Sequence, residues 1–221
     1  MGRLCEEARQ FGFVSVCINP CWVSFAAESL AGSTVRVCTV IGFPLGANAL
    51  STKLAEAELA LAEGAQELDM VQNIGALRSG DFELVKKEIA GLSEIAHPHG
   101  AVLKVILETC LLSEEEKIAA CRLALEGRAD FVKTSSGFST GGATASDVKL
   151  MRRIVGEAAG VKAAGGIHTL DNLLLMLDAG ANRIGTSAGV NIIRELETGK
   201  RSGEAATLNL TKVPGVPAVD Y

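Results

Sequence analysis

The feature that most limits the fold of this chain is the alternation of short apolar runs with longer amphipathic stretches. The short runs have the length of buried strands. They are Val14–Ile18, Val35–Ile41, Glu67–Gln72, Val102–Glu108, Phe131–Thr134, Val161–Ala164 and Arg183–Gly185. The stretches between them carry apolar residues at three- and four-residue spacing, which indicates helices. The clearest are Ala55–Glu63, Glu83–Ala96, Asp147–Ala158 and Leu170–Leu177. This alternation predicts β/α units built on a parallel sheet.

One helix boundary is marked directly by its residue types. Ser113 stands three residues before Glu116, which is the spacing of a capping box. Gly127 lies where it can end the same helix. The sequence therefore predicts a helix between these two signals.

Composition excludes several classes of protein. Apolar residues make up 48% of the chain, enough for a large core, and aromatic residues only 4%. This mix fits helices packed on parallel strands better than a β-sandwich. The net charge of -5 offers no basic surface for nucleic acid or for an anionic membrane. No apolar run reaches the roughly 18 residues of a membrane span, and the first residues do not resemble an export signal. We therefore expect a cytoplasmic protein.

The cysteines give no metal signature. Six are spread through apolar segments, and in a chain without an export signal we expect them to be reduced. Cys17 and Cys21 are spaced as C-x3-C, but no second pair or nearby histidine completes a zinc set. We expect neither a metal nor another cofactor.

The chain is predicted to form one domain over residues 1–197, followed by a tail over residues 198–221, because a polar stretch beginning at Thr198 ends the periodic pattern. No nucleotide-binding glycine motif follows the first strand. This absence argues against an open doubly wound sheet that binds a nucleotide. Polar residues instead cluster at the carboxyl ends of several strands, where (β/α)8 barrels carry their chemistry. They are Asn19, Asp69, Asn73, Lys104, Glu108, Lys133, Ser135, Lys162 and Thr186. We predict a (β/α)8 TIM barrel in the α/β class, with seven strands countable.

The segment FVKTSSGF places a lysine at the mouth of an apolar strand. Alternation puts Phe131, Lys133 and Ser135 on one face. If that face lies inside the barrel, desolvation disfavours the ammonium form of Lys133 and favours the neutral, nucleophilic amine. Lys133 is then a candidate for Schiff-base formation. The alternative is a lysine whose ammonium reaches solvent at the strand end.

Other charged residues occupy comparable positions. Lys162 would bring a second ammonium near Lys133 and favour loss of its proton through like-charge repulsion; a surface lysine is the alternative. Asp69, in an apolar strand, needs a cationic partner and could relay protons; a structural ion pair is the alternative. Lys104 shares a strand face with Glu108, so a local pair between them is also open.

Two glycine-rich segments, Gly165–Thr169 and Ile184–Gly189, run from the last two strands into helices. Backbone N–H groups at such turns form anion sites, and many (β/α)8 barrels bind phosphate after these strands. The Thr186 and Ser187 hydroxyls could add donors, and His168 could assist when protonated. The sequence therefore predicts a phosphorylated substrate, with glycine turns that serve only packing as the alternative.

Several long motifs in order resemble deoxyribose-phosphate aldolases: ELDMVQNIGAL, LKVILETCLL, FVKTSSGF, VKAAGGI and RIGTSAGV, with VSVCINP and CTVIGFPLGA before them. The likeness runs from about Phe13 to about Val190, and several long motifs are far more specific than one short pattern. It implies a class I, metal-free aldolase on a (β/α)8 barrel. Such an enzyme interconverts 2-deoxy-D-ribose 5-phosphate with D-glyceraldehyde 3-phosphate and acetaldehyde. Dimers are common in this family, so a homodimer is expected.

The resemblance also implies residue roles. Lys133 matches the Schiff-base lysine, Lys162 the second lysine that tunes it, and Asp69 the proton-relay aspartate. Lys104 matches a further active-site lysine. Cys17 matches a cysteine at the acetaldehyde end of the pocket, with simple packing as the alternative. The positions expected to hold the substrate and its phosphate are Gly137, Gly165, Gly166, His168, Gly185 and Ser187.

The chain also departs from the family. Members open with a further strand, whereas this chain begins inside the helix that follows it, at Arg3–Gln10. The barrel is therefore expected to lack its first strand. In the family that strand also carries an aspartate that faces the lysines, so this aspartate is expected to be absent too. His168 stands where arginine is common, which predicts weaker phosphate binding. Tyr221 is the last residue; some members fold such a tyrosine over the active site, and a tail without that role is the alternative. Two hypotheses follow: an active aldolase, or an inactive or impaired homologue that binds sugar phosphates or a partner.

Overall fold

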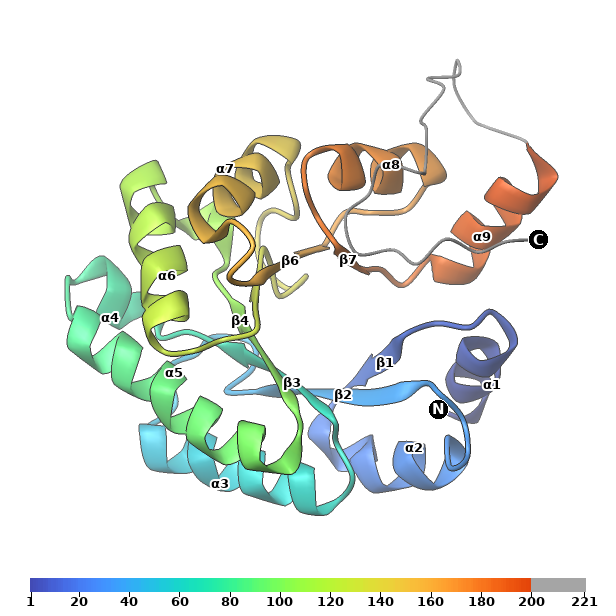
Figure 1. The fold of residues 1–221 in the computed structure, drawn as a ribbon, viewed down its shortest axis with the longest axis horizontal. Helices are drawn as coiled ribbons and strands as arrows, with labels where there is room; N and C mark the ends of the chain where they lie inside the picture. The colour runs from blue at the N-terminus through green and yellow to red at the C-terminus, as the bar shows by residue number, and fades with distance from the viewer. Residues whose placement is uncertain (200–221) are drawn as a thin grey trace.

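The computed structural model describes residues 1–199, which form a curled parallel sheet with helices packed outside it (Figure 1). The sheet has seven strands, each paired with the next in chain order. They are β1 (Ser15–Ile18), β2 (Arg36–Ile41), β3 (Glu67–Val71), β4 (Val102–Ile106), β5 (Phe131–Lys133), β6 (Gly160–Ala164) and β7 (Arg183–Gly185). Each coincides with one predicted run to within a few residues, so the seven predicted strands are confirmed.

The helices follow the strands as the alternation predicts. They are α1 (Gly2–Gln10), α2 (Val23–Ser29), α3 (Leu50–Ala62), α4 (Ile74–Arg78), α5 (Phe82–Ala96), α6 (Glu114–Glu126), α7 (Ala145–Val155), α8 (Leu170–Asp178) and α9 (Gly189–Thr198), with single 3-10 turns at Pro20–Trp22, His97–His99 and Thr109–Leu111. The predicted capping box is confirmed, because Ser113 and Glu116 each accept a hydrogen bond from the other's backbone N–H. Helices α2 and α4 were not predicted, because they are too short to show a clear period of apolar residues.

The hydrophobic core lies between the sheet and the helices around it. In β3, Leu68 and Met70 are fully buried in this core, while Asp69 between them points to the other face of the sheet. The same alternation in β5 sends Val132 into the core and Lys133 to the inner face. The charged side chains of the inner face are almost fully buried, so they lie in a restricted space.

The ring of strands is open in the described part of the chain. There, β1 and β7 are the terminal strands of the sheet, each with a single neighbour. A groove between them is lined largely by apolar side chains, among them Phe13, Ile184 and Ile192. The fold is therefore the predicted TIM-barrel type, with seven strands and an open seam.

Two sequence-based expectations concern the end of the chain. Helix α9 ends at Thr198, and the tail assigned to residues 198–221, with Tyr221, lies almost wholly outside the described residues. The division at residue 197 stays a prediction. Within residues 1–199, no helix is both long enough and apolar enough to cross a membrane.

Candidate active site

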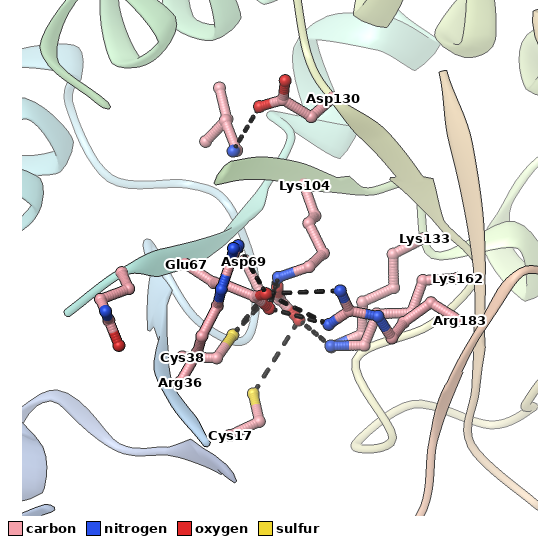
Figure 2. Close-up of polar contacts among 12 residues, drawn as sticks. Cys17, Arg36, Cys38, Glu67, Asp69, Lys104, Asp130, Lys133, Lys162 and Arg183 are labelled. Atoms are coloured by element: carbon pink, nitrogen blue, oxygen red, sulfur yellow. Dashed lines mark hydrogen bonds and ion pairs between the residues drawn. The ribbon is translucent and has the colours of Figure 1, made fainter. Parts of the chain in front are cut away.

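The centre of the inner face is Asp69, a fully buried aspartate held by three lysines (Figure 2). The Nζ atoms of Lys133 and Lys162 lie 2.8 and 2.6 Å from the same oxygen, Oδ2. The Nζ of Lys104 lies 2.9 Å from the other oxygen, Oδ1. The structure thus brings together the four charged residues that the sequence singled out.

Strand register explains why these side chains converge. Asp69 on β3 is paired with Lys104 on β4, and Lys133 on β5 is paired with Lys162 on β6. Side chains of paired residues in a parallel sheet point to the same face. The curvature of the sheet then turns the four side chains toward one another, because strands two and three places apart face each other across the interior (Figures 1 and 2).

The charges of this cluster support one another. Burial alone would raise the pKa of Asp69, but the ammonium groups of Lys162, Lys133 and Lys104 outweigh it and hold that pKa well below its usual range. Burial would also lower the pKa of Lys162, yet the Asp69 carboxylate more than compensates and raises it. Asp69 therefore stays a carboxylate, and Lys162 an ammonium, throughout the neutral pH range.

A second carboxylate, Glu67, lies two residues before Asp69 on the same face of β3 and is also fully buried. Its oxygens lie 2.7 Å from the Lys104 Nζ and 3.0 Å from an Arg183 nitrogen. Arg36 is more distant, at 3.8 Å. Glu67 was not among the predicted site residues, although its two-residue spacing from Asp69 was a usable signal. Glu67 thus pairs with Lys104 and Arg183, while Lys133 and Lys162 pair with Asp69.

Two thiols border the same carboxylate. The Sγ atom of Cys38 lies 3.2 Å from Asp69 Oδ1, and that of Cys17 lies 3.9 Å from Oδ2 (Figure 2). Cys38 is buried, whereas Cys17 is exposed on the terminal strand β1. Cys17 was a sequence candidate and Cys38 was not, because only the register reveals that Cys38 stands beside it.

The loop after Lys133 is anchored by Glu108. The Glu108 carboxylate accepts hydrogen bonds from the Ser136 backbone N–H, at 3.2 and 3.3 Å, and from its hydroxyl. The open alternative of a local Lys104–Glu108 pair is therefore wrong, since Lys104 binds the two inward carboxylates of β3 instead. One further hydroxyl, Ser135 Oγ, is buried without a hydrogen-bond partner among the described residues.

The first predicted phosphate loop follows β6. Gly165 and Gly166 have φ angles of +87° and +76°, which glycine adopts without strain. The Gly165 carbonyl accepts a hydrogen bond from Ala143 N, at 3.0 Å. A Cβ at Gly142 would collide with that carbonyl, so the loops after β5 and β6 meet closely here. Gly142 was not among the sequence candidates, although the pair of glycines at this point was a signal. Around Gly166, by contrast, a Cβ would meet no atom within 4 Å.

The remaining candidates surround the second loop, after β7. Gly185 packs against the lysine cluster, because a Cβ there would lie 3.1 Å from Lys162 Cε. Ser187 and His168 are exposed, as is Gly137 in the loop after β5. The expectation that Thr186 offers a free hydroxyl donor is wrong, since its hydroxyl donates to the Ile167 carbonyl at 2.6 Å and ties the two loops together.

Comparisons with known proteins identify the family of this chain. A family model described as DeoC/LacD family aldolase matches residues 1–196. A deoxyribose-phosphate aldolase of Brevibacillus brevis is 58% identical over 196 residues, which cover 89% of this chain and 88% of the relative. One from Thermococcus gammatolerans is 58% identical over 193 residues, 86% of each chain.

Solved structures agree as well. The structure titled as a unique tetrameric deoxyribose phosphate aldolase from Aeropyrum pernix superposes with a TM-score of 0.83 at 34% identity, and the match covers 89% of this chain and 83% of that one. This chain belongs to the DeoC/LacD family of aldolases.

Proposed function

We propose that this protein is a class I deoxyribose-phosphate aldolase that reversibly cleaves 2-deoxy-D-ribose 5-phosphate to D-glyceraldehyde 3-phosphate and acetaldehyde. The observation that carries this proposal is the placement of Lys133 and Lys162 on one oxygen of buried Asp69. An amine, a charged proton donor and a carboxylate are the groups that imine chemistry needs. The relatives that are 58% identical to this chain are named deoxyribose-phosphate aldolase.

In this mechanism Lys133 is the nucleophile. Its neutral amine attacks the C1 aldehyde of the open-chain sugar, and the carbinolamine loses water to give an iminium. Lys162, an ammonium in the resting site, donates the proton with which the hydroxyl leaves as water, and it regains a proton when Asp69 relays the one lost by the amine.

The iminium then acts as the electron sink for bond cleavage. The C3 hydroxyl loses its proton, the C2–C3 bond breaks, and glyceraldehyde 3-phosphate leaves. An enamine of acetaldehyde remains on Lys133; protonation at carbon and hydrolysis release acetaldehyde and restore the amine. Lys104 keeps Asp69 in place from the other side, and the buried Ser135 hydroxyl is available for a substrate oxygen.

The phosphate is proposed to bind where the loops after β5, β6 and β7 meet. The two glycine turns lead into the starts of α8 and α9, whose dipoles favour an anion. The proposed contacts are Gly137, Gly165, Gly166, Gly185 and Ser187, with His168 as a pH-dependent addition. Cys17 is proposed to border the two-carbon end of the substrate, beside Asp69.

The alternative is an impaired homologue in which the open seam abolishes chemistry. The high identity to named aldolases does not favour it, and trapping distinguishes the two. Incubation with acetaldehyde and sodium borohydride should reduce the imine and leave an ethyl group on Lys133, located by peptide mass spectrometry.

The matched control is Lys117→Ala, which removes a partly buried lysine of α6 that pairs with Asp147 at 2.7 Å. Wild type and Lys117→Ala should both be labelled, and Lys133→Ala should not, with circular dichroism confirming that each is folded. A folded wild type that takes no label, or equal labelling of Lys133→Ala, would refute the proposal.

Two further proposals concern the oligomeric state of the protein and its location in the cell. A homodimer in the cytoplasm is proposed from the resemblance, although the Aeropyrum pernix relative is titled tetrameric. Sedimentation velocity of the full chain measures the assembly directly. A single species at the monomer mass would remove the dimer from the proposal.

A further inference from the structure

Two cysteines on neighbouring strands stand side by side next to the lysine cluster. Cys17 on β1 and Cys38 on β2 are paired in register. Their sulfur atoms and an Asp69 oxygen all lie within 4.8 Å of one another. We propose that Cys17 and Cys38 are a modification site that forms a reversible intramolecular disulfide when the protein meets a peroxide.

The backbone geometry permits this bond. Neighbouring strands lie about 4.8 Å apart, which is inside the roughly 4.4–6.8 Å range of Cα separations in disulfides. The sulfur atoms must still approach by rotation of both side chains and a small shift of one strand. β1 is a terminal strand with one neighbour among residues 1–199, so it can move at lower cost than an inner strand. A bond formed with some strain is more easily reduced, which fits a reversible modification.

The two thiols differ in the way that stepwise oxidation requires. Cys17 is exposed and Cys38 is buried. A hydrogen bond from the Cys38 thiol lowers the pKa of Cys17 to about 6; the partial loss of water around the Cys17 sulfur and Asp69 oppose this change, and Lys162 and Lys133 assist it. The same hydrogen bond, with burial, raises the pKa of Cys38 well above its usual value, although Lys104 opposes it. At neutral pH, Cys17 is thus the reactive thiolate and Cys38 the protonated partner.

The reaction balances with hydrogen peroxide as the oxidant. The Cys17 thiolate attacks one peroxide oxygen, forms an S–O bond and releases hydroxide, which takes up a proton to become water. The Cys38 sulfur then attacks the sulfur of this sulfenic acid as the Cys38 thiol gives up its proton. The S–S bond forms as the S–O bond breaks, and the oxygen leaves as a second water with the Cys38 proton. Two thiols are oxidised and one peroxide is reduced to two waters.

A metal ion is the competing use of the same atoms. Cys17, Cys38 and Asp69 could offer three ligands to a divalent ion. The ammonium groups of Lys133, Lys162 and Lys104 already occupy the oxygens of that carboxylate and would repel a dication. Charge therefore favours the disulfide, in which no positive charge is added.

The test uses the full chain carrying Cys21→Ser. Trypsin leaves Cys17 and Cys21 in one peptide, Gln10–Arg36, and Cys38 in the next, Val37–Lys53. With Cys21 removed, a link between these peptides identifies the Cys17–Cys38 bond. Reduced protein is treated with one equivalent of hydrogen peroxide, free thiols are blocked with N-ethylmaleimide, and the digest is analysed without reduction. We expect the linked peptides, and their loss after dithiothreitol.

Two further variants make the test decisive. In Cys38→Ala, added to the same background, Cys17 should stop at the sulfenic acid, which dimedone traps. In Cys17→Ser, Cys38 should stay fully reduced, which shows that Cys17 reacts first. The proposal is overturned if Cys38 remains a free thiol while Cys17 is oxidised to the sulfinic acid, or if Cys17 links to Cys110 instead. The borohydride trapping of the unoxidised protein does not depend on this bond, so the two proposals fail separately.

Discussion

At the scale of single residues, Asp69 is the group on which the site depends most. Lys104 also pairs with Glu67, but Asp69 is the only carboxylate paired with Lys133 and Lys162 in the described part of the chain. Breaking a buried ion pair by removing one partner costs about 3–5 kcal/mol. We therefore expect Asp69→Asn to lower the free energy of unfolding by roughly that amount, as measured by urea denaturation at pH 7.

Glu94→Gln is the matched control, since it neutralises a carboxylate in an exposed pair with Arg128. Exposed pairs contribute about 0–1 kcal/mol, so this variant should unfold almost as the wild type does. If Asp69→Asn were equally mild, the ammonium groups around it would not be charged and buried as the structure has them.

The thiols make a second prediction at this scale. Because the pKa of Cys17 is lowered to about 6, its thiolate persists at lower pH than that of an ordinary cysteine. The rate of its alkylation by iodoacetamide should rise with pH through about 6 and level off above neutrality. An unperturbed thiol would continue to rise through about 8.5. Mass spectrometry of the Gln10–Arg36 peptide in the Cys21→Ser protein measures this profile.

The cause of the shift can be tested with Cys38→Ala. This variant removes the hydrogen bond that is the largest influence on Cys17, so the midpoint should move upward. A midpoint that stays near 6 in this variant would assign the shift to the lysines instead.

At the scale of elements, the strands could be predicted because each is an apolar run closed by polar residues. The alternation within β3 and β5 also sufficed to place Asp69 and Lys133 on the inner face. Contacts between elements could not be predicted in this way. The Glu108–Ser136 anchor and the Cys17–Cys38 pair depend on register, which no single strand specifies. The helices α2 and α4 had too few turns to give a period.

The glycine loops carry the prediction that belongs to this scale. Gly166 and Gly32 both have positive φ, +76° and +74°, and a Cβ at either meets nothing within 4 Å. Replacing either with alanine should therefore cost a similar amount of stability, about 1–2 kcal/mol. Only Gly166 lies in the loop proposed to bind phosphate. We expect Gly166→Ala to raise the KM for 2-deoxyribose 5-phosphate by roughly tenfold, because the added Cβ would crowd the phosphate and weaken its binding by about one hydrogen bond.

Gly32→Ala is the control because Gly32 lies between α2 and β2, at the amino end of the strand and away from the lysines. Its KM should stay near that of the wild type in steady-state assays. Equal increases in both variants would assign the effect to backbone strain and remove Gly166 from the phosphate site.

At the scale of the whole molecule, the sequence predicted a barrel with seven strands, and the sheet has seven. The sequence did not predict how β1 and β7 are placed relative to each other at the open seam. That placement depends on contacts between these two strands, which neither strand specifies alone. The lysine cluster lies across from that seam, on β3 to β6, where every strand has two neighbours. The site is therefore built on the most constrained part of the sheet, while Cys17 lies at its edge.

This asymmetry predicts how the backbone opens. Amides of β3 and β4 are hydrogen-bonded within a fully paired, buried region, whereas β1 and β7 each have one neighbour within residues 1–199. Local opening should therefore need less free energy at the seam than at the centre of the sheet. In hydrogen–deuterium exchange, peptides covering β1 and β7 should exchange at least about tenfold faster than those covering β3 and β4, a difference of about 1.4 kcal/mol or more. Equal protection at β7 and β3 would contradict an open seam, because it requires a further strand or a second copy of the chain to cover that edge in solution.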